Sequence, residues 1–168
     1  MITRNYAYNT EHAPEQQFAG RNAELQFANL FPPSGWKVTQ ATFDQDRTEH
    51  WDILVEKGDL HLKIDVKDWK RSMEYGMVVL ETGKFSWMEG GNSHIAFKLT
   101  PNTPYDWDSW LVVSRKDLQS IIDNNSFADG QVGVYTAFTK WCVSGDPRPL
   151  YIVPLEIIEF FKIDMWGL

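Results

Sequence analysis

Residues 60–67 read Leu60-His61-Leu62-Lys63-Ile64-Asp65-Val66-Lys67, with an apolar side chain at every second position. Alternation of this kind is typical of a β-strand, because successive side chains of a strand point to opposite faces of the sheet. The pattern predicts one face of leucine, isoleucine and valine side chains and an opposite, polar face. Asp65 and Lys67 share the polar face, so we expect a carboxylate and an ammonium group side by side on a rigid element.

The preceding residues predict a second strand that pairs with this one. The segment Trp51-Asp52-Ile53-Leu54-Val55 is followed by Glu56-Lys57-Gly58-Asp59. A tight turn on Lys57-Gly58 would fold the two strands into an antiparallel hairpin. In that register Asp52 lies opposite Lys63 and diagonal to Asp65, on the same face as both. Diagonal neighbours are roughly 7–8 Å apart, so the two carboxylates are expected to be able to share one divalent cation.

A helix is predicted from Pro14 to Phe31, with Pro14 in its first turn and Pro32-Pro33 as its stop. One stripe of this helix, at helical spacing, faces inward. Its members are Gly20, Glu24, Phe27, Ala28 and Phe31. Burial of an unpaired carboxylate is costly, so Glu24 is expected to meet the lysine or a metal ion at the cluster of Asp52, Asp65 and Lys67.

Four stretches then resemble the PD-(D/E)xK nuclease superfamily, particularly its Holliday-junction-resolvase-like members. They are Gly20-x-x-Ala23-Glu24, Gly35-Trp36-Lys37-Val38, Trp51-Asp52-Ile53 and Asp65-Val66-Lys67, within about residues 18–71. The progression Leu80-Glu81, Trp87 and His94-Ile95-Ala96-Phe97 more faintly resembles phage-borne nuclease-like proteins of the same superfamily. The resemblance implies an α/β fold with a restriction-endonuclease-like core, in which a mixed central β-sheet is flanked by helices.

The resemblance also implies roles for individual residues. Glu24 matches the helix acid, Asp52 and Asp65 the two metal ligands, and Lys67 the lysine of the motif. The implied cofactor is Mg²⁺, for which Mn²⁺ can substitute. Magnesium prefers hard oxygen ligands and keeps several waters, so two carboxylates and the carbonyl oxygen of Val66 would leave room for a phosphate and a water. The sequence leaves open whether the site holds one metal ion or two.

The implied activity is hydrolysis of DNA phosphodiester bonds by a metal-dependent endonuclease, with branched or junction DNA as a candidate substrate. Lys63, Lys70 and Arg71 are the expected contacts to DNA. Cutting both strands of a junction would call for a two-fold homodimer. A second triplet of the same form, Asp68-Trp69-Lys70, continues the apolar parity of the strand, so we expect Asp68 to point to the opposite side.

Length and composition limit the possible classes of protein. The 168 residues suit a single domain over 1–168. No stretch reads as a signal peptide or a membrane span, so we expect a cytoplasmic protein with no membrane partner. The formal net charge of −7 differs from the basic surface usual in nucleic-acid-binding proteins. The single cysteine, Cys142, is expected to be buried.

Two alternatives of other classes follow from the acidity and from the eight tryptophans. Trp107 and Trp110 lie in a polar stretch, where indole rings can stack on bases or sugars. The first alternative is therefore a non-catalytic, acidic and aromatic-rich module that binds carbohydrate or a protein partner. The second is an inactive nuclease-fold inhibitor.

The remaining sequence predicts further sheet and helix. Strands are expected at residues 77–81, 94–99, 110–113, 133–143 and 151–153, and a short helix at 155–161. Ser114-x-x-Asp117 is a capping box, so a second helix is expected to begin there.

Overall fold

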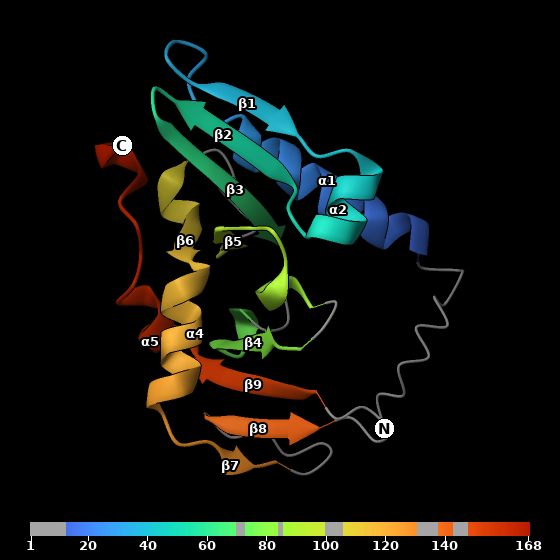
Figure 1. Cartoon of the computed structure of the whole chain (residues 1–168), viewed down its shortest axis with the longest axis vertical. Helices are drawn as coiled ribbons and strands as arrows, with labels where there is room; N and C mark the ends of the chain where they lie inside the picture. Colours follow the sequence, from blue (N-terminus) through green and yellow to red (C-terminus); the bar gives the residue numbers. More distant parts are fainter. Residues whose placement is uncertain (1–12, 70–72, 84–85, 100–105, 131–137, 143–147) are drawn as a thin grey trace.

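Two mixed β-sheets and the helices around them form this α/β protein (Figure 1). The structure is a computed structural model, which describes residues 13–69, 73–83, 86–99, 106–130, 138–142 and 148–168. The larger sheet has the strand order β1-β2-β3-β5-β6. Its strands are β1 (Lys37–Gln40), β2 (Ile53–Lys57), β3 (Leu60–Lys67), β5 (His94–Lys98) and β6 (Trp110–Ser114). The first three form an antiparallel meander, β5 joins β3 in parallel, and β6 returns antiparallel to β5.

The smaller sheet has the order β4-β9-β8-β7. Its strands are β4 (Met77–Glu81), β7 (Ala128–Asp129), β8 (Thr139–Cys142) and β9 (Pro149–Pro154). The helices are α1 (Ala13–Ala28), α2 (Phe43–Glu49), α4 (Arg115–Asn124) and α5 (Leu155–Glu159), with short 3-10 turns η1 (Trp87–Glu89), η2 (Trp107–Ser109) and η3 (Met165–Gly167). None of the helices in the described ranges is both long and apolar enough to cross a membrane.

Each face of the larger sheet packs against its own hydrophobic core. On one face, the Ala23 and Phe27 side chains of α1 meet Ile53, Val55 and Ile64 of the hairpin. On the other face, Ile95 and Phe97 of β5 pack with α4, α5 and the smaller sheet. Helix α4 runs beside both sheets in Figure 1, and its buried side chains pack in the core that the two sheets share.

The alternation in β3 has the predicted effect. Leu62 and Ile64 are buried on the side of α1, whereas Lys63 and Asp65 lie on the opposite face. Asp68, just after the strand, pairs with Lys98 at 3.5 Å. Lys98 lies on the same face of β5 as Ala96, which belongs to the core under α1. Asp68 therefore points to the apolar face of the sheet, as predicted.

The hairpin turn lies one residue later than predicted. It is formed by Gly58 and Asp59, so Lys57 pairs with Leu60 and Leu54, not Asp52, lies opposite Lys63. Gly58 has φ of +58°, a conformation that glycine adopts at low cost and that suits a two-residue hairpin. The register differs by two residues from the predicted one. A shift of two preserves the faces, so Asp52 still belongs to the face of Asp65.

Most of the other predicted helices and strands are present, but some of their bounds differ from the prediction. α1 ends at Ala28 and not at Phe31, and a turn carries the chain to the prolines. The strands near residues 77–81, 94–99, 110–113 and 151–153, the helix near 155–161 and the Ser114 cap are all present. Of the strand predicted at 133–143, residues 139–142 form β8, while 131–137 and 143 lie outside the described residues.

Two predictions about side-chain exposure were wrong. Trp107 and Trp110 are buried in the core under α1, where their rings lie edge-on to Phe27 at 5.8 and 5.0 Å. Their indole area stabilises the core, so neither ring is available to stack on a ligand. Cys142, at the end of β8, is exposed and not buried.

Candidate active site

The hairpin places an acid and an amine in direct contact, as the sequence predicts. The Nζ atom of Lys67 lies 2.8 Å from Oδ1 of Asp65, and the two side chains are 19% and 5% exposed. Both project from β3 on the face away from α1. A charge-assisted pair in such a dry place is much stronger than a surface ion pair.

Asp52 joins them from the start of β2. Its Oδ2 atom accepts a hydrogen bond of 2.6 Å from the backbone N–H of Val66, and its own N–H donates to the carbonyl of Ile64 at 2.9 Å. The side chain therefore continues the hydrogen bonding between β2 and β3 just beyond the Ile53–Ile64 pair. Asp52 is held against β3 between the two residues of the acid–amine pair.

Burial raises the pKa of Asp52 to about 9, with a further rise from the neighbouring Asp65 carboxylate. The Val66 N–H bond opposes this by favouring the charged form. Asp52 is 8% exposed, so little water is available to solvate a charge there. In the metal-free protein Asp52 is thus a neutral acid at pH 7.

Glu24 completes the predicted set from α1. It is half-buried, and burial, followed by the charge of Asp46, raises its pKa. Asp65 raises this pKa as well, while Arg21 and Lys67 lower it. Glu24 therefore interacts electrostatically with the acid–amine pair, although α1 packs on the other face of β3. Direct contacts in the described residues join Asp52 to β3 and Asp65 to Lys67, whereas Glu24 is linked to them only through its charge.

A fourth acid, Asp46 of α2, was missed by the sequence reasoning. Asp46 lies at the surface, yet partial burial of its carboxyl group, followed by the charge of Asp65, raises its pKa, while the charge of Lys67 opposes the rise. The signal that was available is the capping box at the start of α2, where Thr42 and Gln45 bond each other's backbone N–H groups. That signal marks a helix whose first turns carry Asp44 and Asp46.

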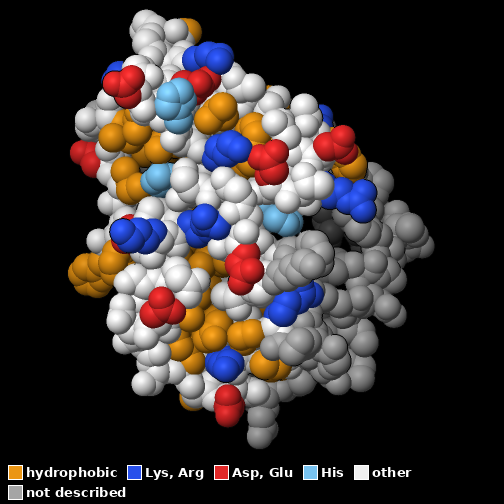
Figure 2. Space-filling view, in the orientation of Figure 1, with side chains coloured by type: hydrophobic (Ala, Val, Ile, Leu, Met, Phe, Trp, Pro, Cys, Tyr) orange, Lys and Arg blue, Asp and Glu red, His pale blue; other side chains and the backbone are white. Residues whose placement is uncertain are grey.

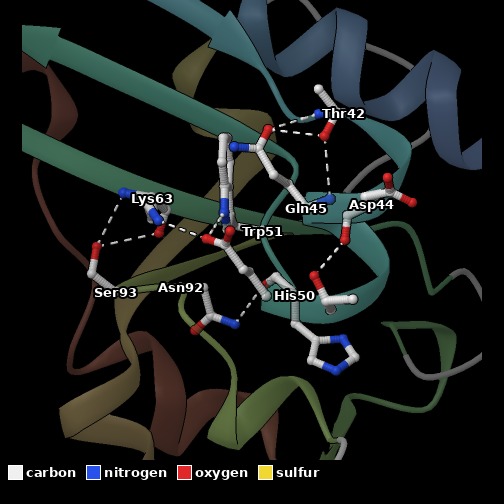
Figure 3. A network of polar contacts seen from close by, with 10 residues as sticks. Thr42, Asp44, Gln45, His50, Trp51, Lys63, Asn92 and Ser93 are labelled. Atoms are coloured by element: carbon white, nitrogen blue, oxygen red, sulfur yellow. Dashed lines mark hydrogen bonds and ion pairs between the residues drawn. The ribbon is translucent and has the colours of Figure 1, made fainter.

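A polar network fixes the junction between α2 and β2 that carries Asp52 (Figure 3). Oε2 of Glu49 accepts hydrogen bonds of 2.8 Å from both Trp51 Nε1 and Lys63 Nζ. His50 ends α2 in the left-handed conformation at φ 55°, and its carbonyl accepts from Asn92 Nδ2 at 2.8 Å. These bonds tie the end of α2 to β3 and to the loop before β5, so they fix the position of Asp52 two residues later.

Two indole rings cover the amine of the site. Nζ of Lys67 lies 5.9 Å from the centre of the Trp69 ring and 5.5 Å from that of Trp87, within the range of cation–π attraction. Burial by itself lowers the pKa of Lys67, but the charge of Asp65 and its hydrogen bond outweigh this, so the pKa lies above its ordinary value. Lys67 therefore stays an ammonium group at pH 7.

One carboxylate oxygen of the site is left without a partner in the ranges that the structure describes. Oδ2 of Asp65 is buried and has no hydrogen-bond partner among the described residues, an unusual and costly state for a carboxylate oxygen. Within the described part of the chain, no three acid, histidine or cysteine side chains are grouped so as to hold an ion together. Magnesium is commonly bound through one or two carboxylates and several waters, which Asp52 and Asp65 can provide.

The other predicted site residues have different surroundings. Val66 contributes its N–H to Asp52, and a role for its carbonyl oxygen stays a prediction. Lys63 is paired with Glu49 and lies 5.0 Å from the Trp51 ring, so its charge is already partly neutralised. Lys70 and Arg71 lie outside the described residues.

Comparison with protein family models, curated proteins and solved structures gave no match. Interpretation of the site therefore depends on its own chemistry. On the face shown in Figure 2, Lys and Arg side chains are interspersed with Asp and Glu and form no separate basic surface among the residues described there. An anionic substrate would be attracted chiefly by a cation at the site.

Proposed function

We propose that this protein is a metal-dependent endonuclease that hydrolyses DNA phosphodiester bonds. The observation that carries the proposal is that Asp52 and the Asp65–Lys67 pair are buried together on β2 and β3, where the charge of Glu24 also acts. Surface hairpins seldom bury two acids against one lysine, because desolvation of the charges is costly. Such an arrangement is typical of functional sites, where burial and like charges shift pKa values.

The order of elements supports a restriction-endonuclease-like core. A helix that carries Glu24 precedes the antiparallel meander β1–β2–β3, and the two motif acids lie at adjacent ends of β2 and β3. This is the order that the resemblance to the PD-(D/E)xK superfamily implies. The mixed sheet has α1 on one face and α4 on the other.

The residues of the site would divide the work in phosphodiester hydrolysis. Bound at Asp52 and Asp65, magnesium would stabilise negative charge on the phosphoryl oxygens and lower the pKa of water. The N–H of Val66 keeps Asp52 in place, and Asp65 orients the Lys67 ammonium. Lys67 can then hold the attacking water and stabilise the anionic transition state. Glu24 adds negative charge that orients Lys67.

The charge of the site explains why a cation is needed. The one ammonium group of the site pairs with Asp65, and the charges of Glu24, Asp46 and Asp52 also act on it. A phosphate would be repelled by these acids in their charged form. A divalent cation reverses the local charge and makes the same site attractive to DNA. Junction DNA and a two-fold homodimer remain the specific substrate and assembly that we propose from the resemblance.

The proposal is tested by cleavage of linear, single-stranded and branched DNA with Mg²⁺, Mn²⁺ or chelator. We expect Asp65→Ala and Lys67→Ala each to reduce the rate about 100-fold or more. Matched controls are Asp59→Asn and Lys116→Ala, which change an exposed acid and an exposed lysine away from the site. Unchanged cleavage in both site variants would refute the assignment, and DNA binding without metal-dependent cleavage would favour a non-catalytic module or inhibitor.

A further inference from the structure

A single buried amide group joins two of the segments that surround the site. Asn92 lies in the loop before β5 and is 1% exposed. Its Nδ2 atom donates to the His50 carbonyl at 2.8 Å and to the Trp87 carbonyl at 2.7 Å. Figure 3 shows the Asn92 side chain beside His50, the residue that ends α2. The amide therefore uses one N–H for the end of α2 and the other for the start of η1.

On one side, the amide holds the backbone that leads to Asp52. His50 has φ of 55°, which is uncommon for a residue other than glycine, and the bond from the amide fixes the direction of its carbonyl. Asp52 follows two residues later and accepts the bond of 2.6 Å from the Val66 N–H. The place of the amide and the place of Asp52 beside β3 are therefore linked.

On the other side, the amide holds the turn that covers the amine of the site. Trp87 begins η1 and is 5% exposed, and its ring centre lies 5.5 Å from Nζ of Lys67. The turn is also bound from α4, because Nη1 of Arg115 donates to the carbonyls of Met88 and Gly90 at 3.2 and 2.6 Å. Arg115 binds the later part of the turn and the amide binds its first residue, so the Trp87 ring is fixed over Lys67.

The surroundings of Asn92 suit an amide better than a carboxyl group. Both acceptors of its Nδ2 atom are backbone carbonyls, and their oxygens carry partial negative charge. The Oδ1 atom is buried without a hydrogen-bond partner among the described residues, which is a cost to the fold. Exchange of Asn92 for aspartate would therefore reverse both contacts with almost no change in shape.

We propose that Asn92 is a positioning residue of the site, which couples the place of Asp52 beside β3 to the place of Trp87 over Lys67. This inference rests on the proposed function, in which Asp52 binds the metal ion and Lys67 acts on the phosphate. Hydrolysis requires these groups to keep a fixed separation, because small displacements of reacting groups cost large factors in rate. Asn92 acts on both groups through the backbone.

The test compares Asn92→Asp with the matched control Asn124→Asp. Asn124 is exposed on α4, and its Nδ2 atom also donates two bonds, to the carbonyl and hydroxyl oxygens of Ser120 at 2.9 and 3.0 Å. NMR of the full chain reports on both ends of the coupling. The amide signal of Val66 responds to the bond with Asp52, and the methylene signals of Lys67 respond to the ring current of Trp87. We expect both signals to shift in Asn92→Asp and to stay unchanged in Asn124→Asp.

Cleavage of DNA in the presence of Mg²⁺ gives the second readout. Asn92→Asp should lower kcat about tenfold or more, while KM changes by less than about twofold. The reason is that the reacting groups lose their alignment, whereas the surface that binds DNA is unchanged. Circular dichroism checks that the variant is folded. In the wild type, both side-chain amide protons of Asn92 should exchange with solvent at least about 100-fold more slowly than those of Asn124.

The outcomes separate this inference from the proposed function. A folded Asn92→Asp with unchanged signals of Val66 and Lys67 would overturn the positioning role and leave the nuclease assignment standing. A shift at only one of the two residues would show that the ends are not coupled, and would overturn it as well. If Asn92→Asp does not fold, equal exchange of the Asn92 and Asn124 amide protons in the wild type would refute the two bonds. A wild-type chain that cleaves no DNA would overturn the proposed function, while the two signals would still decide whether Asn92 couples the two segments.

Discussion

Replacement of Asp52 by asparagine should stabilise the protein above pH 4 and remove one ligand of the proposed metal site. In the folded chain Asp52 accepts a hydrogen bond from the Val66 N–H. Asparagine has nearly the same shape, and its carbonyl oxygen can accept the same bond. The substitution therefore removes the titrating group without the loss of this contact.

The magnitude follows from the pKa of Asp52, which rises from 3.8 to about 9 on folding. The folded protein then holds a proton that the unfolded chain releases above pH 3.8. Stability from this group is complete below pH 3.8 and is lost as the pH rises toward 9, at about 1.4 kcal/mol per pH unit. At pH 7 the loss amounts to about 4 kcal/mol. Asparagine at this position does not titrate. The free energy of unfolding of Asp52→Asn should therefore exceed that of the wild type by about 4 kcal/mol at pH 7 and nearly equal it at pH 4.

Denaturant unfolding between pH 4 and 9, in the presence of chelator, measures the effect as a difference between the two proteins. Glu24 and Asp46 also have raised pKa values and interact with Asp52, so the difference between the two proteins includes this coupling. Asp59→Asn, in the exposed hairpin turn, provides the control and should show no pH-dependent difference from the wild type. Stability curves of Asp52→Asn and wild type that run parallel from pH 4 to 9 would refute the reasoning. Added Mg²⁺ should stabilise only the wild type.

Two further predictions concern the scaffold of the site. Lys98→Met should lower the free energy of unfolding by about 3 kcal/mol, because it leaves Asp68 without its partner where both side chains are 13% exposed or less. The double variant Asp68→Asn/Lys98→Met should recover most of this free energy. Equal stability of the single and double variants would contradict a buried ion pair. Gly90→Ala should reduce thermal stability, since a Cβ atom there would lie 2.5 Å from the His50 Cβ and 2.7 Å from the Glu49 carbonyl oxygen. The control is Gly20→Ala, where nothing lies within 4 Å of the added Cβ atom, and it should be neutral or stabilising.

Much of the site could be predicted because the side chains of a strand alternate between the two faces of the sheet. Leu62 and Ile64 fixed the buried face, so Asp65 was correctly placed although the turn was predicted one residue too early. The error in register was two residues, and an even shift leaves every side chain on its face. A three-residue loop would have reversed Asp52 and removed it from the site.

The errors have equally definite causes. The short helix α2 has no buried residue, so it shows no apolar stripe, and the capping box at Thr42 was its only strong signal. Trp107 and Trp110 are flanked by polar residues in the sequence, yet η2 turns both rings into the core under α1. Local polarity did not reveal this, because the burial of an aromatic ring depends on elements distant in sequence.

The lack of a hydrophobic anchor under α2 has a consequence for how the site is held together. Asp46 lies on this helix and Asp52 just beyond its end, yet the helix is attached through hydrogen bonds and its caps. Segments of this kind open locally at low free-energy cost. The stability of this short segment therefore controls how often Asp52 is held in place beside β3.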